Sequence, residues 1–477
     1  MRQHLVTLLW ASALSGCSLI YNPSNIDKNQ MPPDAAIADA NPALIKLKEV
    51  KSPPLLEGAG QGGSAPAILV VFGEHITPSA VVTIVPRTNP MSQVAIEVSN
   101  VSIAADGNSI GALVKAAYME GVDQTGPNAS GVLKLDVIVT QDGASPQMIE
   151  WDYKPLDELA PGVQPAPAAG TMFSHVDVTN VDFTGTNKAI VQAVGDIKIS
   201  GRVTANANGN TAGAGGCNGG AAGQPGQCFG GGKAAGGGGG FGAPGIAGNA
   251  NTAGAVSGDP LIKIYDGAGM AMNRGGGGAG GDGVEGGGGG GVIELTAGGA
   301  ITVENIQAKG GTNGTASVTR GAGGGAGGTV VLRAGGQLSH PAMLDIGGGA
   351  GGAGGALNIS PGGAGGVGRW RFDAAAVART APAPAPRRGP MIVRPPNPIF
   401  EDKNATLMIT GENGVEITII TRYADNTSTT DTTTLIGDPS SYEAVLRIGI
   451  NTVCVLVPGG SFADDEAKNC VDVAFIP

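Results

Sequence analysis

Five cysteines are the residues of this 477-residue chain whose chemistry is easiest to predict from their spacing. Cys17 follows an apolar run, whereas Cys217, Cys228, Cys454 and Cys470 lie far beyond it. An even number of remaining cysteines in an exported chain predicts two disulfides. Three pairings can form, and we expect Cys217–Cys228 with Cys454–Cys470, because each bridge then stays inside one block of composition. The spacing and the scattered histidines do not match zinc-ligand patterns, so we predict no metal site.

No other group of residues in the sequence predicts catalysis. The adjacent carboxylates Asp464–Glu466 could bind calcium or form a glycosidase pair, but a run of this kind is more often a solvated loop. Lys233 follows three glycines, yet Gln227 and Ala234 depart from the phosphate-binding loop pattern. No histidine has a nucleophile partner nearby in the sequence. We therefore predict no catalytic residue and no cofactor.

The N-terminus has the pattern of a secretion signal. A short basic start precedes the apolar run Leu5–Leu14 and the small residues Ser15 and Gly16. The run is too short to span a bilayer as a mature helix. We therefore predict a signal peptide over residues 1–16.

The last residues of this signal carry a second pattern. Leu14-Ser-Gly-Cys17 resembles the bacterial lipobox, in which the cysteine thiol is acylated and becomes the new N-terminus. The alternative is a buried cysteine in an ordinary signal peptide. The resemblance implies lipidation at Cys17, and Ser18 implies sorting to the outer membrane. Residues 17–43 would then be the lipid anchor and a flexible tether.

The overall composition excludes one class of partner. The formal net charge is −11 and the pI is about 4.9, and no Lys/Arg cluster is interleaved with aromatic residues. An acidic surface repels the phosphate backbone of nucleic acids. We therefore predict no nucleic-acid partner.

Glycine dominates the middle of the chain. Of the 85 glycines, 62 fall between residues 201 and 368, so this stretch has few side chains with which to build an ordinary apolar core. Three segments in and beside it share a form: a strand, a glycine turn, a second strand and then a glycine run. Alternation within these units predicts one buried face. The units and the predicted face are 189–205, 292–308 and 330–346, with Ile197, Ile199, Ile301 and Val303.

Two structures fit the glycine runs themselves. They could be floppy, solvated loops, or extended helices of three residues per turn that pack side by side through backbone contacts. We favour ordered, polyglycine II-type packing, because repeated β-units and a predicted disulfide punctuate the runs. We bound this glycine-rich β-repeat module at residues 171–380. About residues 171–372 are similar to the glycine-rich extracellular domain of the anaplastic lymphoma kinase and leukocyte tyrosine kinase receptors, and to glycine-rich bacterial surface and phage adhesin modules, in segments such as Gly327–Gly335. The resemblance implies binding at a surface.

β-rich blocks flank this module. Residues 44–154 contain short β-branched runs between turn signals, which predict a sandwich. This block resembles an IPT/TIG-type immunoglobulin-like domain in the segments Ser52-Pro-Pro, 58–63, 68–73, 137–145 and 151–153. Residues 391–477 are again β-rich, and we predict that they form a second small immunoglobulin-like sandwich. We predict that residues 155–170 are a linker and that residues 381–390 are a Pro/Ala spacer.

The predicted fold class is thus all-β, with two immunoglobulin-like sandwiches flanking a glycine-rich β-repeat module. The predicted function is that of a non-enzymatic, lipid-anchored protein of the outer membrane, for surface display, adhesion or structure, with a glycan or an envelope protein as ligand. One alternative is a carbohydrate-active hydrolase or lyase on a β-helix-like scaffold. Another is an envelope-assembly or secretion-associated subunit.

Overall fold

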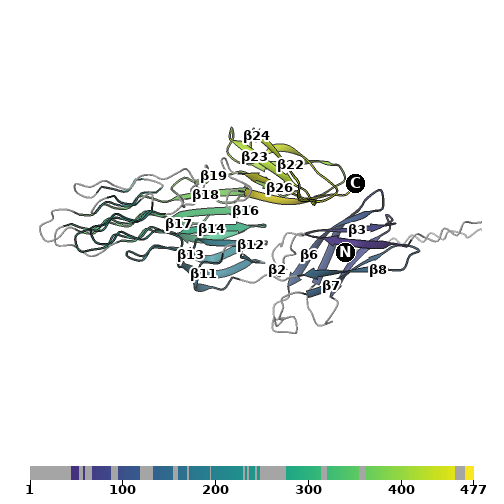
Figure 1. Ribbon diagram of the computed structural model, residues 1–477, viewed down its shortest axis with the longest axis horizontal. Coiled ribbons are helices and arrows are strands. Elements are labelled where there is room, and N and C mark those ends of the chain that lie inside the picture. The colour runs from purple at the N-terminus through teal and green to yellow at the C-terminus, as the bar shows by residue number, and fades with distance from the viewer. Residues whose placement is uncertain are drawn as a thin grey trace, which may run out of the picture. The chain divides into compact units, whose positions relative to one another are not determined.

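The computed structural model describes most of the chain beyond the predicted tether (Figure 1). The described residues are 44–52, 57–59, 67–86, 95–118, 133–153, 159–168, 171–173, 175–193, 195–228, 231–233, 236–241, 244–247, 275–312, 320–353, 361–456 and 468–477. Every regular element among them is a β-strand, so the predicted all-β class is confirmed. Within these ranges no helix is long and apolar enough to cross a membrane.

The first block forms two sheets around one apolar core. Alternate residues of the facing strands, such as Val71, Ile84 and Val137, are buried between them. One sheet contains β1 (Lys46–Lys51), β3 (Ala67–Glu74), β6 (Ser109–Tyr118), β2 (Glu57–Ala59) and β5 (Ala95–Ile103). The other contains β4 (Val81–Pro86), β7 (Leu133–Thr140) and β8 (Gln147–Tyr153).

The glycine-rich module contains an eleven-stranded sheet in which every strand pair is parallel. Each repeat stacks on the next, so that β12, β14, β16 and β18 lie side by side (Figure 1). The two strands of one repeat do not pair with each other, and β16 runs through its glycine pair without a break. The strands are β9 (Gly162–Pro165), β10 (Met172–Phe173), β11 (Val176–Thr184), β12 (Ala189–Ala193), β13 (Ile197–Thr204), β14 (Val292–Ala297), β15 (Ile301–Gln307), β16 (Thr329–Ser339), β17 (Met343–Asp345), β18 (Arg369–Val377) and β19 (Arg387–Arg388).

The predicted buried face of the repeats is confirmed. Ile197 lies opposite Ile301, and Ile199 lies opposite Val303, and all four are fully buried. They belong to a core that also takes alternate residues of β14, β16 and β18, including Leu332. Stacking therefore buries apolar side chains that a single repeat would leave exposed to solvent.

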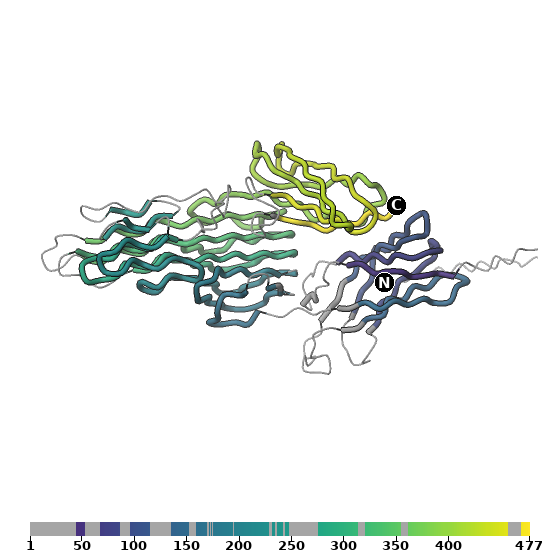
Figure 2. Tube along the Cα trace, in the orientation of Figure 1, coloured from purple at the N-terminus to yellow at the C-terminus, as the bar shows by residue number. Residues whose placement is uncertain are grey.

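The glycine runs continue the stack beyond the ends of the strands (Figure 2). Their backbones hydrogen-bond to one another from layer to layer. Along one line of contacts, the N–H of each glycine donates to the carbonyl of the preceding one, at 2.7–3.0 Å, through Gly209, Gly288, Gly311, Gly325, Gly349 and Gly365. A Cβ atom on Gly325 or Gly349 would overlap a carbonyl of the neighbouring layer, so only glycine permits this approach. We call this line the glycine ladder.

The last block again forms two sheets around an apolar core, with Leu407, Ile419 and Val453 among its buried residues. One sheet contains β20 (Met391–Val393), β22 (Asn404–Thr410) and β25 (Ser440–Val445). The other contains β21 (Ile399–Phe400), β27 (Lys468–Phe475), β26 (Gly449–Leu456), β23 (Glu416–Arg422) and β24 (Ser428–Thr434).

The segments predicted as linker and spacer both contribute to the module. Leu159 and Ala166 are buried in its core, and β9 pairs with β11. Ala381 packs against the same core, and β19 pairs with β18. Proline-rich composition alone does not reveal these contacts, because they depend on strands that lie outside each segment.

Candidate functional site

A cluster of four buried charges lies on the outer face of the module's sheet. In β14, β16 and β18 the residues that point into the core are apolar, and alternate residues point outward. Glu294, Arg333, Arg371 and Asp373 occupy such outward positions, and each is at most 2% exposed. Their strands are neighbours, which brings residues far apart in the sequence together. We call these four residues the charge cluster.

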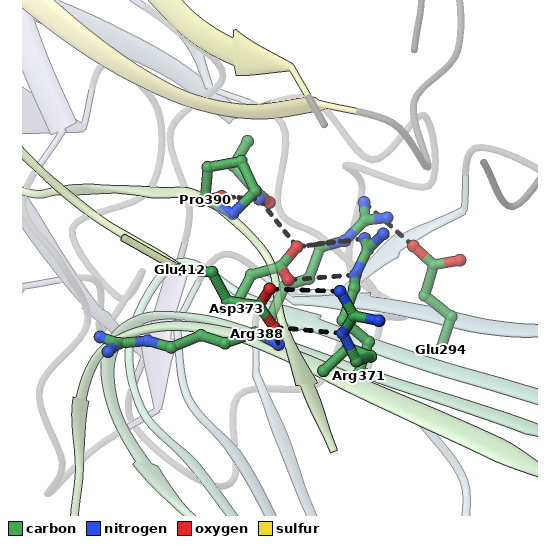
Figure 3. Close-up of polar contacts among 9 residues, drawn as sticks. Glu294, Arg371, Asp373, Arg388, Pro390 and Glu412 are labelled. Atoms are coloured by element: carbon green, nitrogen blue, oxygen red, sulfur yellow. Dashed lines mark hydrogen bonds and ion pairs between the residues drawn. The ribbon is translucent and has the colours of Figure 1, made fainter. Parts of the chain in front are cut away.

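The four side chains form a chain of ion pairs with no net formal charge (Figure 3). Arg333 Nη1 lies 3.1 Å from Glu294 Oε1, and Arg333 Nε lies 3.5 Å from Asp373 Oδ2. Arg371 contacts both oxygens of the Asp373 carboxylate. Its Nε lies 3.1 Å from Oδ1, and its Nη2 donates to Oδ2 at 3.1 Å. Charges this deeply buried require such pairing.

Residues of the last block cover the charge cluster. Asn469 Nδ2, from β27, donates to Asp373 Oδ2 at 2.9 Å and to the Pro390 carbonyl at 2.6 Å. Gly389 lies against the Asp373 carboxylate, where a Cβ atom would overlap Oδ1. Thr410 Oγ1, from β22, donates to the Ala374 carbonyl at 2.9 Å. Asn469 thus joins the charge cluster to the sheet that contains β27, and Thr410 joins the neighbouring Ala374 to the sheet that contains β22.

A second group of charges lies at the edge of this junction. Arg387 donates through Nε and Nη2 to the two carboxylate oxygens of Glu412, each at 3.2 Å. The backbone N–H of Arg388 also donates to Glu412, and its guanidinium pairs with Asp438. Planar two-point contacts of this kind fix orientation as well as attraction.

The environment of the charge cluster favours a structural role over chemistry. Burial lowers the pKa of the Arg371 guanidinium, whereas the charge of Asp373 raises it. Arginine nevertheless stays protonated in proteins, so this group cannot act as a base. Asp373 Oδ2 accepts hydrogen bonds from Arg371 and Asn469, whereas Oδ1 lies in an ion pair with Arg371 and accepts no hydrogen bond from the described residues. The arrangement can hold two parts of the chain in register.

The structure pairs the four distal cysteines as predicted. Cys217 and Cys228 form one disulfide inside the glycine-rich module. Cys454 and Cys470 form the other and lie directly opposite each other in β26 and β27. Cys17, the predicted lipidation site, lies outside the described residues. Both disulfides close loops within one block, as the local pairing requires.

Two candidates from the sequence remain, Lys233 and the carboxylates Asp464–Glu466. Lys233 is exposed on the glycine-rich module, and the carboxylates 464–466 lie outside the described residues. Within the described ranges, no three His, Cys, Asp or Glu side chains come together as a metal site would require. The charge cluster was not anticipated from the sequence. Its signal was the alternation of apolar and charged residues in Trp370-Arg-Phe-Asp373, together with the single charge of Arg333 after the apolar run Val330-Val-Leu.

Comparison with known proteins adds no relative from which a role could be taken. The chain matches no family model, no curated protein and no solved structure.

Proposed function

We propose that this protein is a non-enzymatic, lipid-anchored protein of the outer membrane that presents a stiff glycine-rich module for surface display or adhesion. The observation that carries the proposal is the glycine ladder. Backbone hydrogen bonds link successive layers from Gly209 to Gly365. A linker that only spaced two domains would not need such contacts.

The glycine segments are best explained as polyglycine II-type helices. In the run 361–368, Gly363 and Gly366 are buried, whereas Pro361 and Val367 are exposed and Ala364 is half-buried. The side chains of Pro361, Ala364 and Val367 thus recur at intervals of three, the repeat of this extended helix. Two of every three positions face neighbouring backbones, and the third can carry a side chain.

The surface of these glycine runs is better suited to binding a ligand than to catalysing a reaction. Their side chains are mostly absent or small, and their few charges include an ion pair between Arg320 and Asp282, at 3.9 Å. The flanking blocks, which we propose to be immunoglobulin-like, would hold the module and connect it to the tether. A glycan or an envelope protein is the expected ligand.

The membrane part of the proposal can be tested with the full chain in a Gram-negative host. Metabolic labelling with an alkyne-bearing fatty acid should label the wild-type protein, which should fractionate with the outer membrane. Cys17→Ser should lose the label. Ser18→Asp is the matched control: it should keep the label but move to the inner membrane. Equal labelling of wild type and Cys17→Ser would contradict lipidation at this residue.

The parallel ladders support one other candidate function. Stacked parallel strands are also the scaffold of β-helix enzymes, and the module has this pairing throughout its described strands. A glycan screen with analysis of the bound material separates the two roles. Binding that leaves the glycan intact supports adhesion, whereas shortened or unsaturated products would establish a hydrolase or lyase.

A further inference from the structure

His340 is buried among aromatic rings at the end of β16. It is 2% exposed, and its ring centroid lies 4.7 Å from that of Phe372 and 5.4 Å from that of Trp370, both in edge-to-face contact. Its Nδ1 atom is buried and has no hydrogen-bond partner among the residues that the structure describes. A buried polar atom without a partner is uncommon and calls for an explanation.

The same two rings hold the segment that leads into the last block. The indole N–H of Trp370 donates to the Pro384 carbonyl. The Arg388 guanidinium carbon lies 5.9 Å from the centre of the Phe372 ring. Ala381 packs against the same core. Residues 381–388, which we call the strap, are thus fixed by rings that His340 touches directly.

The charged groups around His340 do not favour a second cation. Arg379 Nη1 donates to the His340 carbonyl at 3.1 Å. Glu304, from β15, is occupied by the same arginine, with contacts of 3.3 and 3.5 Å. Arg388, from β19, lies on the Phe372 ring. Glu304 already pairs with Arg379, so a proton added to the buried ring of His340 gains no free counter-ion from this carboxylate.

Burial lowers the pKa of His340. A histidine whose pKa is lowered on folding stabilises the fold fully above its ordinary range near 6.5, and this contribution is lost as the pH falls through that value. The surroundings of His340 disfavour a protonated ring, and the lowered pKa likewise means that stability is lost as the pH falls.

We propose that His340 is an acid-sensitive latch. Protonation drives its ring out from between Trp370 and Phe372 and releases the strap from the end of the glycine-rich module. The proposal does not depend on adhesion or on lipidation. It assigns a regulatory role to the junction between the module and the last block, with acidity as the signal.

Segment-resolved amide hydrogen exchange of the purified full chain tests this, with rates corrected for the intrinsic effect of pH. Between about pH 7.5 and about pH 5, exchange in residues 369–388 should rise at least about tenfold in the wild type. Residues 321–328 should stay protected, which distinguishes strap release from unfolding. His340→Phe keeps the ring and should abolish the rise, and His340→Gln provides a second non-titrating variant.

The control is His75→Gln, which changes an exposed histidine of the first block and should leave the transition intact. Three results would overturn the latch. One is no change in residues 369–388 of the wild type, and another is the same rise in both His340 variants. The third is simultaneous loss of protection in residues 321–328.

Discussion

At the scale of single residues, the charge cluster is the feature with the largest expected effect. Asp373 receives contacts from Arg333, Arg371 and Asn469, and all four residues are buried. Removing one partner of a buried ion pair typically costs about 3–5 kcal/mol, because the remaining charge is left uncompensated. The cost measures the penalty of the broken pair rather than a net gain from forming it.

Asp373→Asn should therefore lower the free energy of unfolding by about 3 kcal/mol or more. Urea unfolding followed by near-UV circular dichroism measures the loss. Asp177→Asn is the control, because the Asp177–Lys198 pair is more than half exposed and should contribute less than about 1 kcal/mol. Equal losses of unfolding free energy in the two variants would show that burial of the charge cluster does not increase the cost of removing a charge.

A second prediction at this scale concerns pH. Burial raises the pKa of Asp196, while a hydrogen bond from the Ala300 N–H, at 2.7 Å, and the charge of His175 lower it. The folded state then holds this proton more tightly than the unfolded state, so stability falls as the pH rises from 3.8 through the raised value. Asp196→Asn keeps an oxygen for the Ala300 N–H and should remove this fall, as measured by thermal unfolding between about pH 4 and about pH 7. An unchanged pH profile would refute the assignment.

At the scale of elements, the sequence predicts the strands well and their neighbours poorly. The runs 68–72, 81–85 and 133–139 lie within β3, β4 and β7, because β-branched residues alternating between turn signals are a local property. The parallel stacking of repeats is not local. It depends on which strand of another repeat pairs with each repeat. The alternation of apolar residues alone does not specify that strand.

The charge cluster was missed for the same reason. Glu294 and Asp373 are 79 positions apart, and nothing in either strand alone indicates that they share Arg333 as a partner. The local disulfides could be predicted, because each bridge closes a short loop: the cysteines are separated by 11 and 16 positions. Short loops restrict the choice of partner in a way that stacked strands do not.

The glycine ladder gives a prediction for this scale. Gly349→Ala would place a methyl group against the carbonyl of Gly311, whereas on Gly347 the nearest atom is a side-chain oxygen of Asp345, 3.3 Å away. Gly349→Ala should therefore destabilise the module by at least about 1–3 kcal/mol, and Gly347→Ala much less. Proteolysis of residues 320–353 in native conditions would measure both. Similar resistance in the two variants would contradict close layer packing.

At the scale of the whole molecule, contacts of the charge cluster connect the glycine-rich module to the last block. The proposed membrane anchor lies at the other end of the chain, beyond the tether. Because the predicted tether is flexible, only the stiffness of the module itself can give its exposed surface a fixed shape for binding. The proposed function therefore depends on the order of the glycine runs.

Amide hydrogen exchange in residues 286–291 and 321–328 of the full chain tests this order most directly. These glycines donate to backbone carbonyls of neighbouring layers, for example Gly288 to Gly209 and Gly325 to Gly311. Their exchange should be at least about 1,000-fold slower than in an unstructured chain. Exchange within about tenfold of the unstructured rate would show that the runs are solvated linkers and would contradict the account.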